Sequence, residues 1–363
     1  MNRRQFLRAG LMTIPSFSVG AEVLAQIVQE PQWRTYEIVT SVQVLQPSGT
    51  TRVWLPQPLA DRTAFQRSVA RGVHCEGGKI RTYDNSHGGM KILAAEFPAG
   101  VPPLLTMTEQ VATRNWSVDL VGSPSQPGSA LPPQVAAFLE PTRYIPTGGL
   151  VKTRAEQITR GASTDLEKAQ AIYQWIVENT YRDPKVRGCG FGDIVPMLQT
   201  GNLGGKCADL NALFVGLAKA SGIPARDVYG IRLGPSALEC KSLGTDPSGV
   251  ITKAQHCRAE VYLHHFGWVP MDPADVRKVV LEESPGHLPL SDSKVQSARR
   301  RLFGSWEMNW MAYNYAQDVT LPGSSGPPLH FFMYPQAETS EGRVDSLDPA
   351  AFHYEISAHE LRS

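Results

Sequence analysis

Cys207, His256 and Asp272 are the residues of this chain whose types and order suit nucleophilic chemistry. A cysteine attacks a carbonyl carbon as its thiolate, a histidine stabilises the thiolate and then protonates the leaving group, and a carboxylate orients the histidine. Taken singly, a core thiol, a strand histidine and an aspartate before a proline have ordinary structural explanations. Together, on the elements that the sequence predicts around them, they indicate a Cys-His-Asp triad for acyl transfer.

The cysteine is expected in the first turn of a helix. Apolar residues recur at i, i+3, i+4, i+7 and i+8 from Leu210 to Ala218, which predicts a helix with one buried face that includes Cys207. The pair Gly204-Gly205 precedes this helix, and Gly222 ends it. The positive end of the helix dipole favours the thiolate at such a position.

A developing oxyanion needs hydrogen-bond donors near the same end of the helix. The backbone N–H of Cys207 is the first candidate. Gln199 and Asn202, in the segment before the helix, are candidates for the second donor, and the sequence does not decide between them.

A hairpin is expected to bring the histidine and the aspartate together. Residues 256–263 alternate between the two faces of a strand, residues 264–267 are typical of a turn, and residues 268–273 predict the returning strand. Asp272 then lies beside the start of the first strand, where His256 stands.

Three blocks of this region resemble the transglutaminase-like superfamily of papain-type cysteine enzymes. They occur in the family's order and lie within roughly residues 140–275. The blocks are Gly205-Lys206-Cys207-Ala208-Asp209-Leu210-Asn211-Ala212-Leu213-Phe214 with Gly222-Ile223-Pro224-Ala225-Arg226, then His256-Cys257-Arg258-Ala259-Glu260-Val261-Tyr262, then Gly267-Trp268-Val269-Pro270-Met271-Asp272-Pro273.

The resemblance implies a triad of Cys207, His256 and Asp272 on an α+β core in which a helix packs against antiparallel strands. The family often has a bulky aromatic residue two positions after its histidine, where this chain has Arg258. We expect that difference to affect packing or substrate preference and not the triad.

Asp209 and Glu260 also match the family's blocks. We interpret both as structural polar residues that hold the ends of the loop and the strand.

The whole chain is expected to be α+β, with a papain/transglutaminase-like core preceded by an all-β, sandwich-like domain. Short β-prone runs between Pro and Gly turns fill residues 30–120. Ser, Pro and Gly in residues 121–140 predict a linker. The catalytic core is expected over residues 141–275. Residues 276–363 are expected to be an extension whose aromatic cluster and late strands complete the core.

Residues 1–25 resemble a twin-arginine export signal. Arg3-Arg4 is followed by Phe6-Leu7, then by an apolar stretch from Ala9 to Val19 and small residues up to Ala25. The apolar stretch is short and interrupted, so stable membrane insertion is not expected. We expect cleavage near Ala25 and a periplasmic location.

Charge and cysteine content limit the kinds of partner and cofactor that we expect. The net charge of +1, from 35 Lys+Arg and 34 Asp+Glu, argues against a nucleic-acid partner. A metal site at His256, Cys257 and His264 lacks the usual zinc-ligand spacing, so neither a metal nor another cofactor is expected. The sequence leaves open whether the cysteines other than Cys207 are bridged. They are Cys75, Cys189, Cys240 and Cys257.

The function predicted is that of an exported cysteine peptidase or amidase, which cleaves a peptide or protein amide through a thioester. A transglutaminase shares the acyl-enzyme step and remains an alternative, as does a non-catalytic binding protein that retains the fold. Pocket-lining residues are expected in the 234–254 loop and around Trp306–Tyr315. The substrate itself is not predicted.

Overall fold

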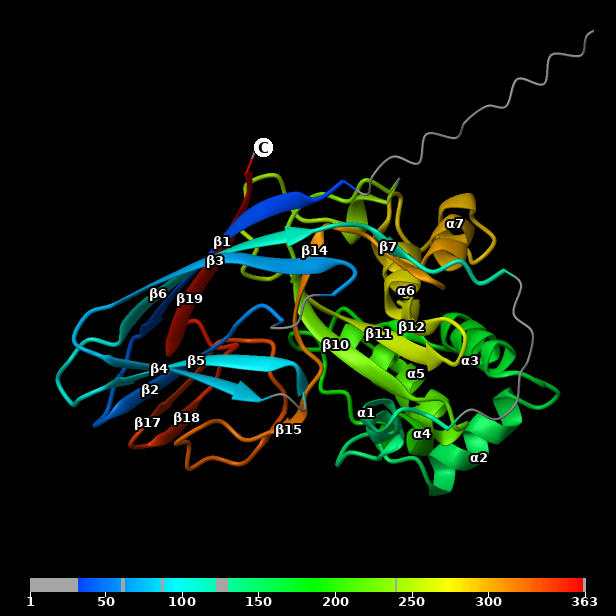
Figure 1. Ribbon diagram of the computed structural model, residues 1–363, viewed down its shortest axis with the longest axis horizontal. Coiled ribbons are helices and arrows are strands. Elements are labelled where there is room, and N and C mark those ends of the chain that lie inside the picture. The colour runs from blue at the N-terminus through cyan, green and yellow to red at the C-terminus, as the bar shows by residue number, and fades with distance from the viewer. Residues whose placement is uncertain (1–31, 60–62, 86–87, 122–129, 239, 362–363) are drawn as a thin grey trace, which may run out of the picture. The chain divides into compact units, whose positions relative to one another are not determined.

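The computed structural model describes residues 32–59, 63–85, 88–121, 130–238 and 240–361. Residues 32–363 group as one compact unit, in which strands and helices occupy different regions (Figure 1). The predicted export signal lies outside the described residues, as does part of the predicted linker, residues 122–129.

Two antiparallel sheets form a β-sandwich. The first has the order β19-β1-β6-β3 and the second β18-β17-β2-β5-β4. Side chains from both sheets, such as Met107 from the first and Phe97 from the second, fill one apolar core between them. The predicted all-β region is therefore confirmed. Its strands are β1 (Arg34–Val44), β2 (Thr51–Pro56), β3 (Gln66–Cys75), β4 (Lys79–Asn85), β5 (Met90–Phe97), β6 (Leu104–Thr113), β17 (Gln336–Thr339), β18 (Gly342–Val344) and β19 (Phe352–Leu361).

The sequence predicts that the last strands of the chain complete the core. In the structure they complete the sandwich instead. β19 pairs antiparallel with β1, from Thr35 opposite Leu361 to Val44 opposite Phe352. β17 pairs with both β2 and β18. Apolar alternation predicts a strand without specifying its sheet, and β1 offers an open edge that β19 covers.

The second half of the fold is a four-stranded antiparallel sheet with helices packed against it. Its strand order is β12-β11-β10-β14, and β11 and β12 form the predicted hairpin, with Leu263 opposite Gly267. Helix α5 packs on β10 and β11, and α2, α3 and α6 pack on α5. These elements are β10 (Ala225–Arg232), β11 (Gln255–Leu263), β12 (Gly267–Met271), β14 (Trp310–Asn314), α2 (Gly149–Ile158), α3 (Asp165–Asn179), α5 (Cys207–Ala220) and α6 (Pro273–Glu282).

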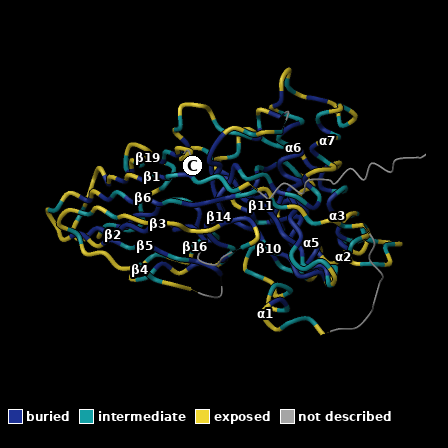
Figure 2. The backbone as a smooth tube through the Cα atoms, turned by 45° about the horizontal axis from the view of Figure 1, so that its top comes forward, coloured by how far each residue is buried: buried dark blue, intermediate teal, exposed yellow. Residues whose placement is uncertain are grey.

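The sequence predicts a single buried face for helix α5, but the helix is buried on all sides. All of its residues from Cys207 to Ala220 are buried, and its trace is dark blue in Figure 2. The sheet covers one side and the neighbouring helices cover the others, which suits a helix with very few polar residues. The first turn of α5 is therefore held from several directions.

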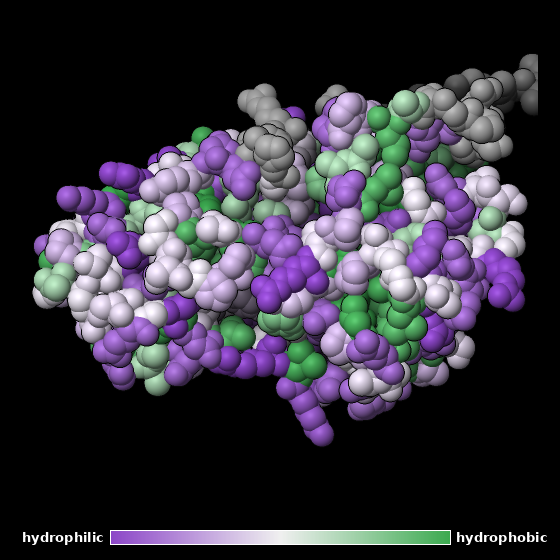
Figure 3. Space-filling view, turned by 90° about the horizontal axis from the view of Figure 1, so that it is seen from below, coloured by the Kyte–Doolittle hydropathy of each residue, from purple (hydrophilic) through white to green (hydrophobic). Residues whose placement is uncertain are grey.

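Shorter elements connect these layers. They are α1 (Pro133–Ala136), α4 (Ile194–Thr200), α7 (Ser293–Arg301), 3₁₀ turns at Ala137–Leu139 and Lys241–Leu243, and the paired strands β7 (Trp116–Ser117) with β13 (Ser305–Trp306), β8 (Tyr181–Arg182) with β9 (Gly204–Gly205), and β15 (Gln317–Val319) with β16 (Leu329–Phe331). None of the described helices is long and apolar enough to cross a bilayer. Seen from below, the surface is a mosaic of hydrophilic residues and smaller hydrophobic patches (Figure 3).

Candidate active site

Cys207 is the first residue of α5, as predicted, and only 4% of its surface is exposed. Strand β9 leads into the helix and pairs in parallel with β8. Gly205 permits the close approach of the helix, because a Cβ there would lie 2.5 Å from the Cβ of Asp209. The thiol thus lies where the helix dipole favours its anion.

Asp209 ties a loop to the first turn of α5. Its Oδ1 accepts the N–H groups of Phe191 at 2.9 Å and Gly192 at 2.8 Å, and its Oδ2 accepts the N–H of Lys206 at 2.9 Å. The Cys189 carbonyl also accepts the N–H of Ala208 at 2.9 Å. The loop that carries Cys189 is therefore fixed against the residues around Cys207, and Asp209 has the structural role expected of it.

Replacing Gly190 with alanine is expected to slow alkylation of Cys207 by iodoacetamide. Gly190 has a φ of +94°, and a Cβ there would lie 1.9 Å from Asp209 Oδ2, so the loop or the carboxylate must move. A displaced loop would weaken the stabilisation of the thiolate and raise the pKa of Cys207, so we expect alkylation to slow at pH values near that pKa.

Gly201→Ala is the matched control for that substitution. Gly201 also has a positive φ, +72°, but a Cβ there meets nothing within 4 Å. It carries the backbone strain without the clash. Equal alkylation rates in the two variants would show that the Asp209 contact does not control the thiol.

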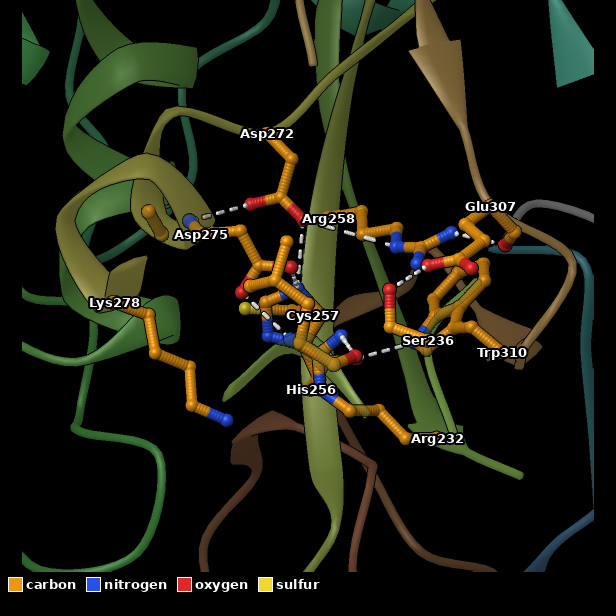
Figure 4. A network of polar contacts seen from close by, with 12 residues as sticks. Arg232, Ser236, His256, Cys257, Arg258, Asp272, Asp275, Lys278, Glu307 and Trp310 are labelled. Carbon is orange, nitrogen blue, oxygen red and sulfur yellow. Dashed lines mark hydrogen bonds and ion pairs between the residues drawn. The ribbon is translucent and has the colours of Figure 1, made fainter. Parts of the chain in front are cut away.

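His256 and Asp272 meet as the hairpin predicts. His256 stands near the start of β11, and Asp272 is the N-cap of α6, directly after β12. Their side chains are both buried, and His256 Nε2 lies 2.7 Å from Asp272 Oδ2 (Figure 4). The indole N–H of Trp310 donates to the His256 carbonyl at 2.8 Å. Since Nε2 faces Asp272, Nδ1 is the nitrogen left for the thiol.

A second carboxylate, which sequence reasoning missed, faces the same histidine. Asp275 Oδ2 lies 3.4 Å from His256 Nε2, and Asp275 Oδ1 accepts a hydrogen bond from Arg232 at 2.6 Å. Asp272 Oδ1 accepts the N–H of Asp275 at 3.1 Å. The signal was present in the sequence: an aspartate before Pro273 is an N-cap pattern, and residue 275 then falls in the first turn of the helix.

Arg258, where the family often has an aromatic residue, supports the aspartate. Its Nε lies 3.7 Å from Asp272 Oδ2, and its Nη1 donates to the Glu307 carbonyl at 3.0 Å. The guanidinium lies over Trp310 at 4.7 Å and Trp306 at 5.6 Å. Arg258 is buried among these groups, and it packs behind Asp272.

The thiol of Cys207 is acidic in this setting. Its pKa lies well below the usual value, because the neighbouring thiols of Cys189 and Cys257 and the ring and charge of His256 favour the anion against burial. The pKa of Cys189 is raised well above its usual value by the neighbouring Cys207 and by burial, and the Cys189 thiol donates to the Gln255 carbonyl at 3.2 Å. Burial, and then the contact with Cys207, raises the pKa of Cys257 as well. Both neighbours therefore remain thiols. None of Cys75, Cys189, Cys207 and Cys257 is bridged.

The histidine favours its charged form. Burial and the Arg232 charge lower the pKa of His256, but the charges of Asp275 and Asp272 and the hydrogen bond to Asp272 outweigh them, so the pKa is raised above its usual value. Together with the low pKa of Cys207, this favours a thiolate–imidazolium pair.

The two side chains expected as second oxyanion donors lie elsewhere. Asn202 Oδ1 accepts the hydroxyl of Tyr181 at 2.8 Å and the N–H of Gly204 at 3.3 Å, which gives it a turn-forming role. Neither Asn202 nor Gln199 is among the described residues that line the cleft beside Cys207.

Cys207 and His256 open onto a cleft of about 600 Å³. Its lining includes residues of the 244–255 loop, as expected in part from the sequence, together with Tyr334 and residues from 346–354. The predicted aromatic cluster does not line it: Trp306 and Trp310 pack instead with Phe65. The C-terminal segment that completes the sandwich therefore also supplies a wall of this cleft.

His256, Asp272 and Asp275 have ligand atoms close enough to hold a metal ion. However, Arg258 and Arg232 already lie against the two carboxylates, and their positive charges oppose a cation there. The alternative metal set in the sequence is not assembled, because His264 follows the far end of β11 from His256. The absence of a metal cofactor stays a prediction.

Comparison with known proteins identifies the family. The profile of the Transglutaminase-like superfamily matches residues 152–273, which include all three candidate residues. An uncharacterized protein of Haemophilus influenzae is 35% identical over 347 residues, covering 90% of this chain and 91% of its own. The chain belongs to the transglutaminase-like superfamily.

A solved structure shares the fold of this chain over most of its length. The crystal structure of a proposed cysteine protease from Cytophaga hutchinsonii aligns with a TM-score of 0.56 at 15% identity and covers 92% of each chain. The periplasmic domain of TgpA from Pseudomonas aeruginosa aligns with a TM-score of 0.36 at 15% identity, over 69% of this chain and 90% of its own. At these identities, the Cytophaga structure supports the transglutaminase-like fold alone.

Proposed function

We propose that this superfamily member is an exported thiol hydrolase that cleaves peptide or protein amides, with Cys207 as nucleophile, His256 as acid and base, and Asp272 as the group that orients His256. One observation carries the proposal. The His256–Asp272 contact of 2.7 Å stands beside a thiol whose pKa is lowered, at the wall of a cleft. Burial alone raises the pKa of a thiol, so the lowered pKa of Cys207 reflects the groups around it.

The reaction begins when Cys207 Sγ adds to the amide carbonyl carbon, and the carbonyl oxygen takes the negative charge. In this proposal, the backbone N–H of Cys207, at the start of α5, stabilises the oxyanion. The His256 imidazolium gives its proton to the leaving nitrogen, the C–N bond breaks, and a thioester remains. Water then loses a proton to His256 and adds to the thioester carbon. Cleavage of the C–S bond releases the acid and restores the ion pair.

Transamidation uses the same thioester and differs only in that an amine replaces water. We propose hydrolysis because water is the abundant nucleophile in the periplasm. Release of free acid from a peptide amide in the presence of a primary amine measures both outcomes. Predominant formation of the amine adduct would replace hydrolysis with transglutamination.

The pH dependence of Cys207 alkylation tests the ion pair. The thiolate exists above the pKa of Cys207, which is lowered, and the imidazolium exists below the pKa of His256, which is raised. We expect iodoacetamide to react rapidly with Cys207 at pH values well below ~8.5, the ordinary cysteine pKa.

His256→Ala removes the imidazolium charge that favours the thiolate, so it should move the alkylation midpoint of Cys207 upward. His264→Ala, at the distant turn after β11, is the matched control and should leave the midpoint unchanged. An unshifted midpoint in His256→Ala would rule out the ion pair.

Export is part of the proposal and rests on the twin-arginine-like run near the N-terminus. Mass spectrometry of the protein recovered from the periplasm would locate the new N-terminus, which we expect near Ala25. Replacing Arg3-Arg4 with lysines should retain the full-length chain in the cytoplasm.

A further inference from the structure

The cleft beside Cys207 is lined by many more cations than acids. Among the described lining residues, Asp246 is the one acidic residue, and its exposed carboxylate accepts the N–H of Ser248 at 2.8 Å. The cationic lining residues are Arg182, Arg187, Lys206, Arg232, Lys253 and Lys278.

Ion pairs account for four of these six cations. Arg232 pairs with Asp275 and Arg187 with Asp345, each at 2.6 Å. Glu282 is shared by Arg182 and by Lys278, the latter at 3.7 Å. The three carboxylates lie behind the cations and do not line the cleft.

Lys206 and Lys253 are the exceptions. Within the part of the chain that the structure describes, neither ammonium forms an ion pair with a carboxylate, so the cleft retains a positive excess. Lys206 directly precedes Cys207, and Lys253 lies three residues before His256. The two unpaired charges thus come from the segments that carry the nucleophile and the base.

Part of the cleft lining is apolar and aromatic. It includes Leu347, Phe352, Tyr334 and Tyr354. Backbone hydrogen bonds join the strand that carries Phe352 and Tyr354 to the 244–255 loop: the Ile251 N–H donates to the Ile356 carbonyl at 2.7 Å, and the Ala358 N–H donates to the Gly249 carbonyl at 2.8 Å. A cleft with one apolar wall and convergent charged groups suits a chain-like ligand whose polar groups point to one side.

We propose that the preferred substrate is an acidic peptide, with carboxylate side chains within a few residues of the scissile amide. This assignment of substrate class rests on the proposed amide hydrolysis. A cleft with an excess of one charge concentrates ligands of the opposite charge, and carboxylates form charge-assisted hydrogen bonds with lysine and arginine. The apolar wall then contacts the peptide backbone and its uncharged side chains.

Binding to the Cys207→Ala variant tests the charge preference without turnover. The probes are acetyl-Ala-Glu-Ala-Ala-Glu-Ala-amide and the same peptide with glutamine in place of both glutamates, titrated by calorimetry at low salt. We expect the acidic peptide to bind roughly tenfold more tightly, and the difference to shrink as salt screens the charges.

Charge neutralisation identifies the groups responsible. In the Cys207→Ala background, Lys206→Gln with Lys253→Gln should remove most of the preference for the acidic peptide. Lys79→Gln neutralises an exposed lysine on β4, outside the cleft lining, and should leave the preference intact.

The outcomes separate the two proposals. Equal affinity for the two peptides, or a preference that the double substitution does not reduce, would overturn the acidic-peptide assignment even where the native enzyme hydrolyses amides. Preferential binding of the acidic peptide, with no hydrolysis of either peptide by the native protein, would support the assignment of the cleft and overturn the proposed hydrolysis. Faster hydrolysis of the acidic peptide supports both.

Discussion

Replacing Cys207 with serine is expected to lower amide hydrolysis by at least about 10³-fold, to the level left by binding and oxyanion stabilisation alone. A serine hydroxyl fits the same space, but His256 cannot hold it as an anion, because its pKa lies far above that of a thiol. The side chain is buried at the start of a helix packed on all sides, so the near-isosteric change should preserve the fold. Turnover and the circular-dichroism melting curve measure the two effects.

Cys75→Ser is the matched control, because Cys75 is a free and partly buried thiol in the sandwich. It should retain full activity. Cys207→Ser should also lose the rapid phase of iodoacetamide labelling, which Cys75→Ser retains. Hydrolysis that persists in Cys207→Ser would exclude Cys207 as the nucleophile.

Replacing Asp272 with alanine is expected to lower kcat/KM for amide hydrolysis by about 10³-fold. The change removes the 2.7 Å contact that orients His256 and one of the two charges that raise the pKa of His256. The high-pH limb of the activity profile should therefore move to lower pH, because the imidazolium is lost earlier as pH rises. Asp275 remains and limits the size of that shift.

Stability must be separated from catalysis in this variant, since Asp272 is also the N-cap of α6 and accepts the Asp275 N–H. Asp292 caps α7 in the same way, through the Lys294 N–H at 2.8 Å, and does not line the cleft. Asp292→Ala should lose about 1 kcal/mol of stability with unchanged kcat/KM. An unchanged pH limb in Asp272→Ala would contradict the orienting role.

The sequence predicts the structure well where a local pattern of residues determines which side chains lie close together. Helical spacing after Cys207 and the strand–turn–strand pattern after His256 predict α5 and the β11–β12 hairpin, and hairpin pairing alone brings residues 256 and 272 together. These are short-range relations in the chain. They specify neighbours without any knowledge of the rest of the fold.

Long-range contacts could not be read in this way. The carboxylate of Asp209 binds the loop that carries Cys189 and so holds it near Cys207. Arg258 packs against Trp306 and Trp310 and lies 3.7 Å from Asp272. The partner of β19 is β1, at the other end of the described chain. Strand alternation and charge do not encode which distant segment will supply a contact, because that choice depends on the packing of the whole molecule.

The pairing of β19 with β1 also sets an order of events during synthesis. Residues 34–44 leave the ribosome long before residues 352–361, so β1 lacks its outer neighbour until β19 has been synthesised. Tyr354 and Phe352, which form part of the cleft wall, arrive with that strand. A nascent chain can therefore contain the complete Cys207 helix and the His256–Asp272 hairpin and still lack a closed cleft. The order of translation therefore delays the assembly of the site until β19 has been synthesised.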